Sequence, residues 1–122
     1  MSHDPTAPAK GLPVLDLDGA CEFLELSRAE IMLLVPQAMI EIRDKFERIH
    51  PALRAEAFAD AARYAHTIKS VAASIGAEAV RQCAETLELH AKTAAPDNCP
   101  QLAEALQGEI ARLTQAVAAL PQ

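Results

Sequence analysis

Aromatic side chains are scarce in this sequence: its 122 residues include no tryptophan, one tyrosine and three phenylalanines. Strands favour aromatic and β-branched residues, so this composition argues against a core built from β-sheets. Hydrophobic residues nevertheless make up 51% of the chain, and many of them are alanine, the residue with the highest helix propensity. The composition therefore favours an all-α fold around a single core.

Other common features are missing as well. No apolar run approaches the roughly 18 residues that a membrane-spanning helix needs, and residues 1–12 contain no apolar segment of the kind found in secretion signals. The three cysteines are odd in number and form no Cys-x-x-Cys pair, so we expect reduced thiols rather than a disulfide framework. These features predict a cytoplasmic protein with no membrane partner.

Basic residues are fewer than acidic ones, 11 against 17, and the net charge is −6. This balance argues against nucleic acid as a partner. The exception is the segment 43–69, which holds six basic and four acidic side chains. A mildly positive block of this kind is typical of a solvated helix face.

The spacing of apolar residues predicts a leader and five helices. Residues 1–13, with three prolines, are expected to form a flexible leader, and residues 14–122 a single domain. Apolar residues recur at intervals of three and four through most of that domain. The predicted helices are a short one from Asp16 or Asp18 to about Leu26, then Ser27 to about Ile49, Ala55–Ile75, Ala77–Thr93, and a last one whose apolar stripe runs from Leu102 to Leu120.

Capping residues, prolines and one glycine set the expected boundaries of these helices. Ser27 and Glu30 match a capping box, and Pro36 is expected to kink or divide the helix that they open. His50 and Pro51 mark a break, and Gly76 can take the left-handed conformation that ends a helix. With Asp97 or Asn98 capping the last helix, the short connections predict an up-down-up-down four-helix bundle with a short additional N-terminal helix.

His66 is predicted to lie on the solvent side of its helix. At 100° per residue, the apolar stripe of that helix falls on the side opposite His66. The neighbours within about 60° of His66 are short side chains and one lysine: Ala59, Ala62, Lys69, Ser70 and Ala73. Long solvent-facing helix surfaces usually carry large charged side chains. The small patch around one nucleophile therefore indicates a docking surface for another protein.

The segment His66-Thr67-Ile68-Lys69-Ser70-Val71-Ala72-Ala73-Ser74-Ile75-Gly76 resembles the motif H-x-L-K-G-[SA]-[SA]-x-x-[IL]-G of histidine phosphotransfer (HPt) domains. Matching positions are His66, Lys69, Ala72, Ile75 and Gly76, with Ile68 as a conservative variant. The resemblance implies a phosphocarrier rather than an enzyme, in which His66 is phosphorylated and Lys69 offsets the phosphoryl charge. It also implies response-regulator receiver domains and a hybrid sensor kinase as partners of a monomeric phosphorelay protein.

That resemblance implies no cofactor on this chain, because Mg²⁺ and the acidic pocket belong to the partner receiver domain. Two positions depart from the motif. Ser70 replaces the usual glycine and narrows access to the imidazole, whereas Val71 falls at the edge of the bundle. Some members hydrogen-bond the histidine with a glutamine on the following helix, and the equivalent residue here is Glu88. Its side chain could orient His66 but would disfavour a phosphoryl group.

Two other interpretations are open at this point, and the roles of two cysteines remain to be assigned. A metal-binding bundle would need several Glu-x-x-His elements, and the sequence has one, from Glu47 to His50, so we expect no metal site. A bundle that only binds partners, with His66 never phosphorylated, is the main alternative function. Cys83 is expected to be a small buried hydrophobe, whereas Cys99, at a helix start, could be a thiol with a lowered pKa.

Overall fold

The computed structural model describes residues 11–93 and 96–121, and its regular elements over these ranges are all helical. In chain order they are α1 (Leu17–Leu24), α2 (Arg28–Arg54), α3 (Phe58–Ser74), α4 (Glu78–Lys92), the short 3-10 helix η1 (Pro96–Asn98) and α5 (Cys99–Ala118). The prediction of an all-helical fold is confirmed. Residues 1–10 of the predicted leader and residues 94–95 of the predicted turn lie outside the described residues.

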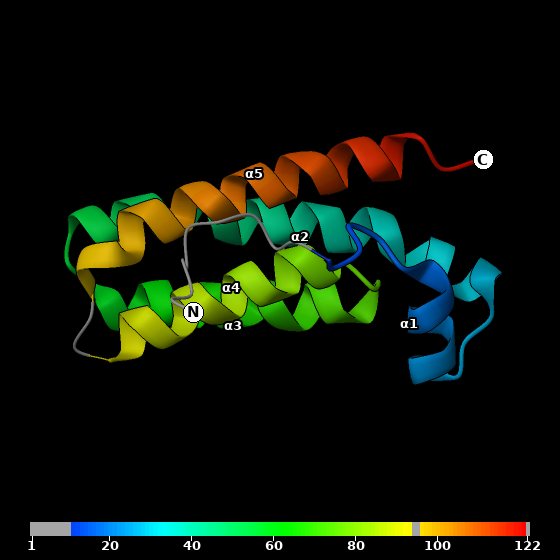
Figure 1. Cartoon of the computed structure of the whole chain (residues 1–122), viewed down its shortest axis with the longest axis horizontal. Helices are drawn as coiled ribbons and strands as arrows, with labels where there is room; N and C mark the ends of the chain where they lie inside the picture. Colours follow the sequence, from blue (N-terminus) through cyan, green and yellow to red (C-terminus); the bar gives the residue numbers. More distant parts are fainter. Residues whose placement is uncertain (1–10, 94–95, 122) are drawn as a thin grey trace.

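The four long helices pack side by side (Figure 1). Helix α2 contacts α3, α3 contacts α4, α4 contacts α5, and α5 contacts α2, so each long helix has two neighbours. The most extensive of these interfaces joins α3 and α4. Helix α1 lies at one end of the bundle, against α2 and α3. None of the described helices is long and apolar enough to cross a bilayer.

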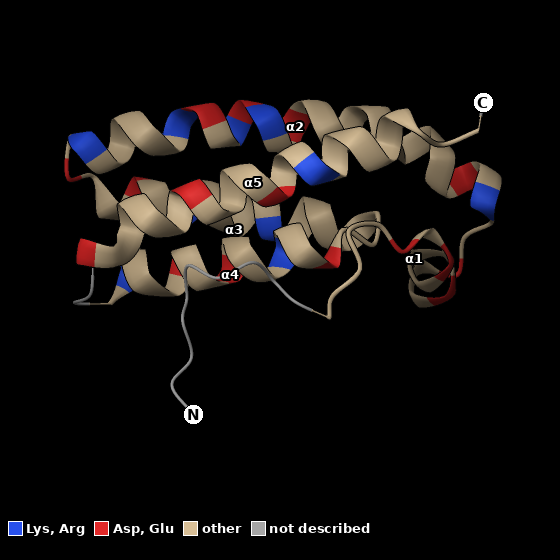
Figure 2. Cartoon of the chain, turned by 45° about the horizontal axis from the view of Figure 1, so that its top comes forward, with Lys and Arg blue, Asp and Glu red and all other residues tan. Residues whose placement is uncertain are grey.

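The core lies between the four long helices and is aliphatic. Its largest fully buried side chains are Ile31, Ile42, Ile49, Ile68, Ile75, Val80, Leu87, Leu102, Leu106 and Leu113. Burying one side chain of this size stabilises the fold by about 1.5–3 kcal/mol. Two charged side chains, Glu88 and Glu109, are also buried. Helix α1 carries acidic but no basic residues (Figure 2). The apolar stripes expected from the sequence therefore face the core.

Side chains at the starts of the helices cap them largely as predicted. Ser27 and Glu30 form the capping box: Ser27 N donates to Glu30 Oε1 at 2.9 Å, and Glu30 N donates to Ser27 Oγ at 3.1 Å. Asp16 caps α1 by accepting from the Gly19 N–H at 2.9 Å. Asn98 occupies the cap position of α5, but its side chain makes no capping hydrogen bond.

Helix α2 is longer than predicted, because neither of its prolines ends it. It runs without division through Pro36 and Pro51 to Arg54, so the break predicted at His50 and Pro51 is wrong. A proline removes one backbone donor and still offers its own carbonyl, and the Pro51 oxygen accepts a hydrogen bond from Ala55 N at 3.0 Å. The buried Ala52, one residue later, keeps this last part of α2 packed on the bundle.

Gly76 makes the sharp connection between α3 and α4. Its φ of +75° is left-handed, as the sequence predicted, and its carbonyl oxygen accepts a hydrogen bond from Asp16 N at 2.8 Å. A Cβ at this position would collide with the backbone carbonyl of Asp16. Nearby, Ala79 N donates to Pro13 O at 3.1 Å. Gly76 therefore turns the chain and lets the segment before α1 approach the α3–α4 corner.

We predict that Gly76→Ala lowers the free energy of unfolding by about 2–4 kcal/mol, because a left-handed alanine costs about 1–2 kcal/mol and Asp16 must also move. Gly108→Ala is the matched control. Gly108 lies within α5, where a Cβ meets nothing within 4 Å, and this substitution should raise stability by about 0.5–1 kcal/mol. Urea unfolding of the three proteins measures both effects. Equal stability of Gly76→Ala and the wild type would contradict this account of the corner.

Candidate functional site

Helix α3 presents one face to the core and the opposite face to solvent. Ala61, Ala65, Ile68 and Ala72 are completely buried, whereas 57% of the His66 side chain is exposed. The apolar stripe predicted for this helix therefore does face the core, and His66 does lie on the exposed side. His66 stands where a protein partner can reach its ring.

The imidazole of His66 is held from the next helix. Its Nδ1 lies 2.9 Å from Oε2 of Glu88, on α4. The Glu88 side chain is almost completely buried, with 4% exposed. An ionised carboxylate can only accept hydrogen bonds, so Nδ1 carries the proton in this contact. The remaining nitrogen, Nε2, then has a free lone pair and is the nucleophilic atom of the ring.

Two lysines share the same carboxylate. Lys69 Nζ lies 2.8 Å from Glu88 Oε1, and Lys92 Nζ lies 2.9 Å from Glu88 Oε2. Burial by itself would raise the pKa of Glu88, but the contacts with Lys69, Lys92 and His66 outweigh it and lower this pKa to about 2. Glu88 is therefore ionised at neutral pH. With neutral His66 the cluster of four side chains has one excess positive charge.

The other residues of the predicted docking face differ in their exposure to solvent. Ala59 and Ser70 are exposed as expected, and Ala73 is half-buried in a groove that Phe23 of α1 also lines. Ala62 is buried, with 2% exposed, so its placement on the open surface is wrong. It lies on the side of α3 that packs toward α4, a rotation that the periodicity of α3 alone does not reveal.

The alanines leave a hollow beside the imidazole. This depression has a volume of about 350 Å³ and is lined by Ala59, Ala62, Arg63, His66, Glu88 and Lys92. Its alanines are too short to cover the ring, and two cationic side chains border it. Lys92 was not predicted as part of the site. Its position four residues after Glu88, one helical turn along the same face, is the signal that would have found it.

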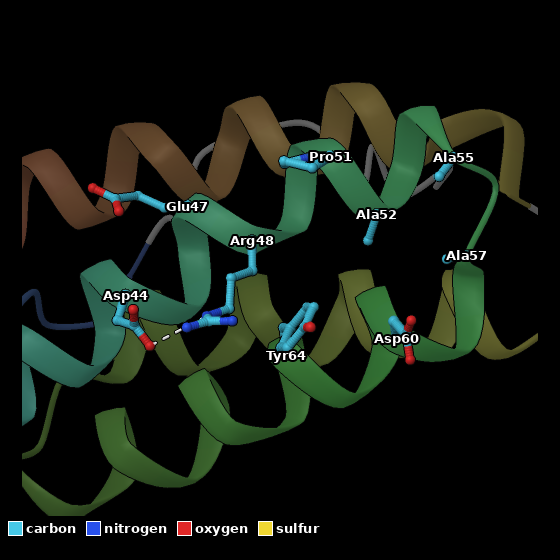
Figure 3. Close-up of a pocket in the computed structure, with 9 residues that line it drawn as sticks. All are labelled: Asp44, Glu47, Arg48, Pro51, Ala52, Ala55, Ala57, Asp60 and Tyr64. Atoms are coloured by element: carbon cyan, nitrogen blue, oxygen red, sulfur yellow. Dashed lines mark hydrogen bonds and ion pairs between the residues drawn. The ribbon is translucent and has the colours of Figure 1, made fainter.

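A second depression, of about 540 Å³, lies between α2 and α3 (Figure 3). Asp44 and Arg48 form an ion pair at 3.4 Å in it, and Tyr64 extends from α3. His66 does not line it. Two residues along a helix turn a side chain by about 200°, so Tyr64 and His66 face nearly opposite directions. This depression is separate from the site around His66.

The remaining candidates are structural. Burial and the nearby charge of Glu109 raise the pKa of Cys83 to about 11, and burial raises the pKa of Cys99. The prediction of a lowered pKa for Cys99 is wrong, because its thiol is completely enclosed. His50 packs edge-on against Phe46, with ring centroids 5.5 Å apart. Within residues 11–93 and 96–121, no group of three His, Cys, Asp or Glu side chains is placed to hold a metal ion.

Comparison with known families identifies the domain. The model of the Hpt domain matches residues 34–116, which include α3, α4 and most of α2 and α5. The chain therefore belongs to the Hpt domain family. Hpt domains are phosphocarriers of two-component systems and interact with receiver domains of response regulators and with kinases. No curated protein and no solved structure matches the chain.

The lowered pKa of Glu88 predicts a pH dependence of stability. A carboxyl whose pKa falls from 4.5 to about 2 on folding stabilises the protein above pH 4.5, and this contribution disappears as the pH falls toward 2. Its size at neutral pH is on the order of 3 kcal/mol. We therefore expect wild type to exceed Glu88→Gln in unfolding free energy at pH 7, with the difference shrinking below pH 4.5. Urea unfolding from pH 7 to pH 2 measures it, and parallel profiles would contradict the ion-pair network.

Proposed function

We propose that His66 carries a phosphoryl group between receiver-domain aspartates of a two-component phosphorelay. The observation that supports this most is the exposed imidazole on α3 of an Hpt domain, with Nδ1 held by Glu88 and Nε2 open. No other described histidine pairs with a buried carboxylate across two helices. The chain acts as a phosphocarrier intermediate without independent turnover.

The transfer needs one nucleophilic atom from this chain. The lone pair of Nε2 attacks phosphorus, the N–P bond forms, and the P–O bond to the receiver's aspartate breaks, so that aspartate leaves as a carboxylate. The Nδ1 proton stays in place, and the ring becomes positively charged. Glu88, 2.9 Å from Nδ1, stabilises this charge. Glu88 was expected to disfavour the phosphoryl group by charge repulsion. Its attraction to the positively charged ring offsets this repulsion.

Lys69 and the receiver supply the remaining electrostatics. Lys69 lies one turn after His66 and offsets the charge of the phosphoryl group. The Mg²⁺ that compensates the transferring group belongs to the receiver, so this chain needs no cofactor of its own. Transfer in either direction follows from the same geometry, with a hybrid sensor kinase supplying the phosphoryl group to the relay.

We also propose a topology, a domain boundary, a location and an oligomeric state for this chain. The close turn at Gly76 and the ring of contacts between α2, α3, α4 and α5 support an up-down-up-down bundle. Residues 14–122 act as one domain, in the cytoplasm and as a monomer, with a short leader before it. Ala59, Ser70 and the half-buried Ala73 form the small-residue face on which the receiver sits.

His66→Gln should abolish acid-labile phosphorylation by a phosphorylated receiver while leaving the helical circular dichroism unchanged. His66 is one of three partners of the buried Glu88 carboxylate, and the glutamine amide replaces its hydrogen bond only in part, so the substitution should lower the free energy of unfolding by about 1–2 kcal/mol. The matched controls are His50→Gln and His90→Gln, which keep the site and should label like the wild type. Mapping the acid-labile phosphate in all four proteins measures this, and full labelling of His66→Gln would disprove the assignment.

The docking face makes a separate prediction. Ser70 is exposed one turn after His66, and Ser70→Arg places a long side chain where the receiver must approach. Transfer requires the reacting atoms to lie about 3–3.5 Å apart, so we expect the rate from a receiver to fall by about 100-fold or more. Gln107→Arg, on the exposed side of α5, is the control of equal charge and size. Single-turnover kinetics measure the transfer rate of each variant, and melting curves verify that it is folded. An unchanged transfer rate in Ser70→Arg would show that the receiver docks on another surface.

A further inference from the structure

Lys92 is a cation next to His66 that lies outside the motif around the histidine. Its Nζ lies 2.9 Å from Oε2 of Glu88, and His66 Nδ1 lies 2.9 Å from the same oxygen. The ammonium is therefore no farther from the imidazole nitrogen than twice that distance. Lys92 also lines the depression beside the ring. Its charge is within reach of any group bound to His66.

The two lysines that contact Glu88 differ in how much of the side chain is exposed to solvent. Lys69 has 28% of its side chain exposed, whereas Lys92 has 59%. Water can solvate the Lys92 ammonium when it leaves the carboxylate, whereas the buried Glu88 keeps its contacts with Lys69 and His66. Lys92 is therefore the partner that the carboxylate can release, and its flexible side chain can swing toward the opening of the depression. Lys69, more enclosed between α3 and α4, has less room to move.

We propose that Lys92 moves from Glu88 to the phosphoryl group when His66 is phosphorylated, and so serves as a second phosphoryl-binding cation. This inference rests on the proposed function of His66. Lys92 forms no covalent bond at any stage. Its role is to carry positive charge from the carboxylate to the phosphoryl oxygens.

The charges of the cluster explain why the exchange occurs at this step. In the resting site, Oε2 of Glu88 is shared by the Nδ1–H group and Lys92. Attack by Nε2 makes the ring cationic, and the ring then supplies the positive charge that Oε2 needs. Lys92 is released at the moment when up to two negative charges arrive at Nε2. Glu88 thus keeps Lys92 close to His66 before the transfer, and Lys92 is still positively charged when it is released.

The test compares Lys92→Gln, Lys92→Arg and a matched control, Arg112→Gln. Arg112 contacts the buried Glu109 on α5 at 2.9 Å and is 55% exposed, so it is likewise an exposed cation paired with a buried carboxylate on its own helix. Glu109 lies near Cys83 rather than His66. The donors are phosphoramidate, whose P–N bond breaks with release of ammonia as the N–P bond to Nε2 forms, and a phosphorylated receiver domain.

We expect Lys92→Gln to accept the phosphoryl group about tenfold more slowly than the wild type from both donors at low salt. Lys92→Arg should restore most of the rate, and Arg112→Gln should match the wild type. In 1 M salt the Debye length falls to about 3 Å, so the deficit of Lys92→Gln should shrink. Melting curves verify that each variant is folded at the assay temperature.

Three results would overturn these ideas in distinguishable ways. Wild-type rates in Lys92→Gln at low salt would remove Lys92 from the reaction while leaving His66 as the acceptor. A deficit that persists in 1 M salt and is not rescued by arginine would show a structural role instead. Failure of both donors to label His66 in the wild-type protein would overturn the proposed function itself.

Discussion

Burial of the Glu88 carboxylate between α3 and α4 is the constraint on which the site depends. Removing such a charge from water costs several kcal/mol unless partners replace the lost hydration. Lys69, Lys92 and His66 are these partners, and each lies within 2.9 Å of a carboxylate oxygen. The same contacts orient the imidazole, select its protonated nitrogen and gather two cations around it. Stability and reactivity therefore share one set of interactions.

Close packing of α3 and α4 makes this burial possible. Both helices bury many alanines, among them Ala62, Ala65, Ala84 and Ala91, so little side-chain bulk separates the two backbones. The turn at Gly76 places the start of α4 directly beside the end of α3. Gly76 also approaches Asp16 closely, which holds the start of α1 at the same corner. An aromatic-poor composition thus serves the site as well as the core, because large side chains would separate His66 from Glu88.

The site combines an open surface with a charged interior. The His66 ring is exposed together with its neighbours Ala59 and Ser70, whereas Lys69 and Lys92 both contact the buried Glu88. This division suits a carrier, which must expose its nucleophile to different partners and still hold it in a single orientation. Cys83 and Cys99, buried with raised pKa values, add no second nucleophile to the exposed surface.

The sequence by itself determined that the chain is helical, the caps of α1 and α2, and the face of α3 that carries His66. These follow from local rules: the capping box at Ser27, the left-handed turn at Gly76 and the three-and-four spacing of apolar residues. Only the tertiary structure decided that Glu88 is buried with three partners, that Lys92 joins them, that Ala62 lies under the surface and that α2 continues through Pro51. Each of these depends on how two helices are rotated and spaced against each other, and the periodicity of a single helix holds no information about its neighbour.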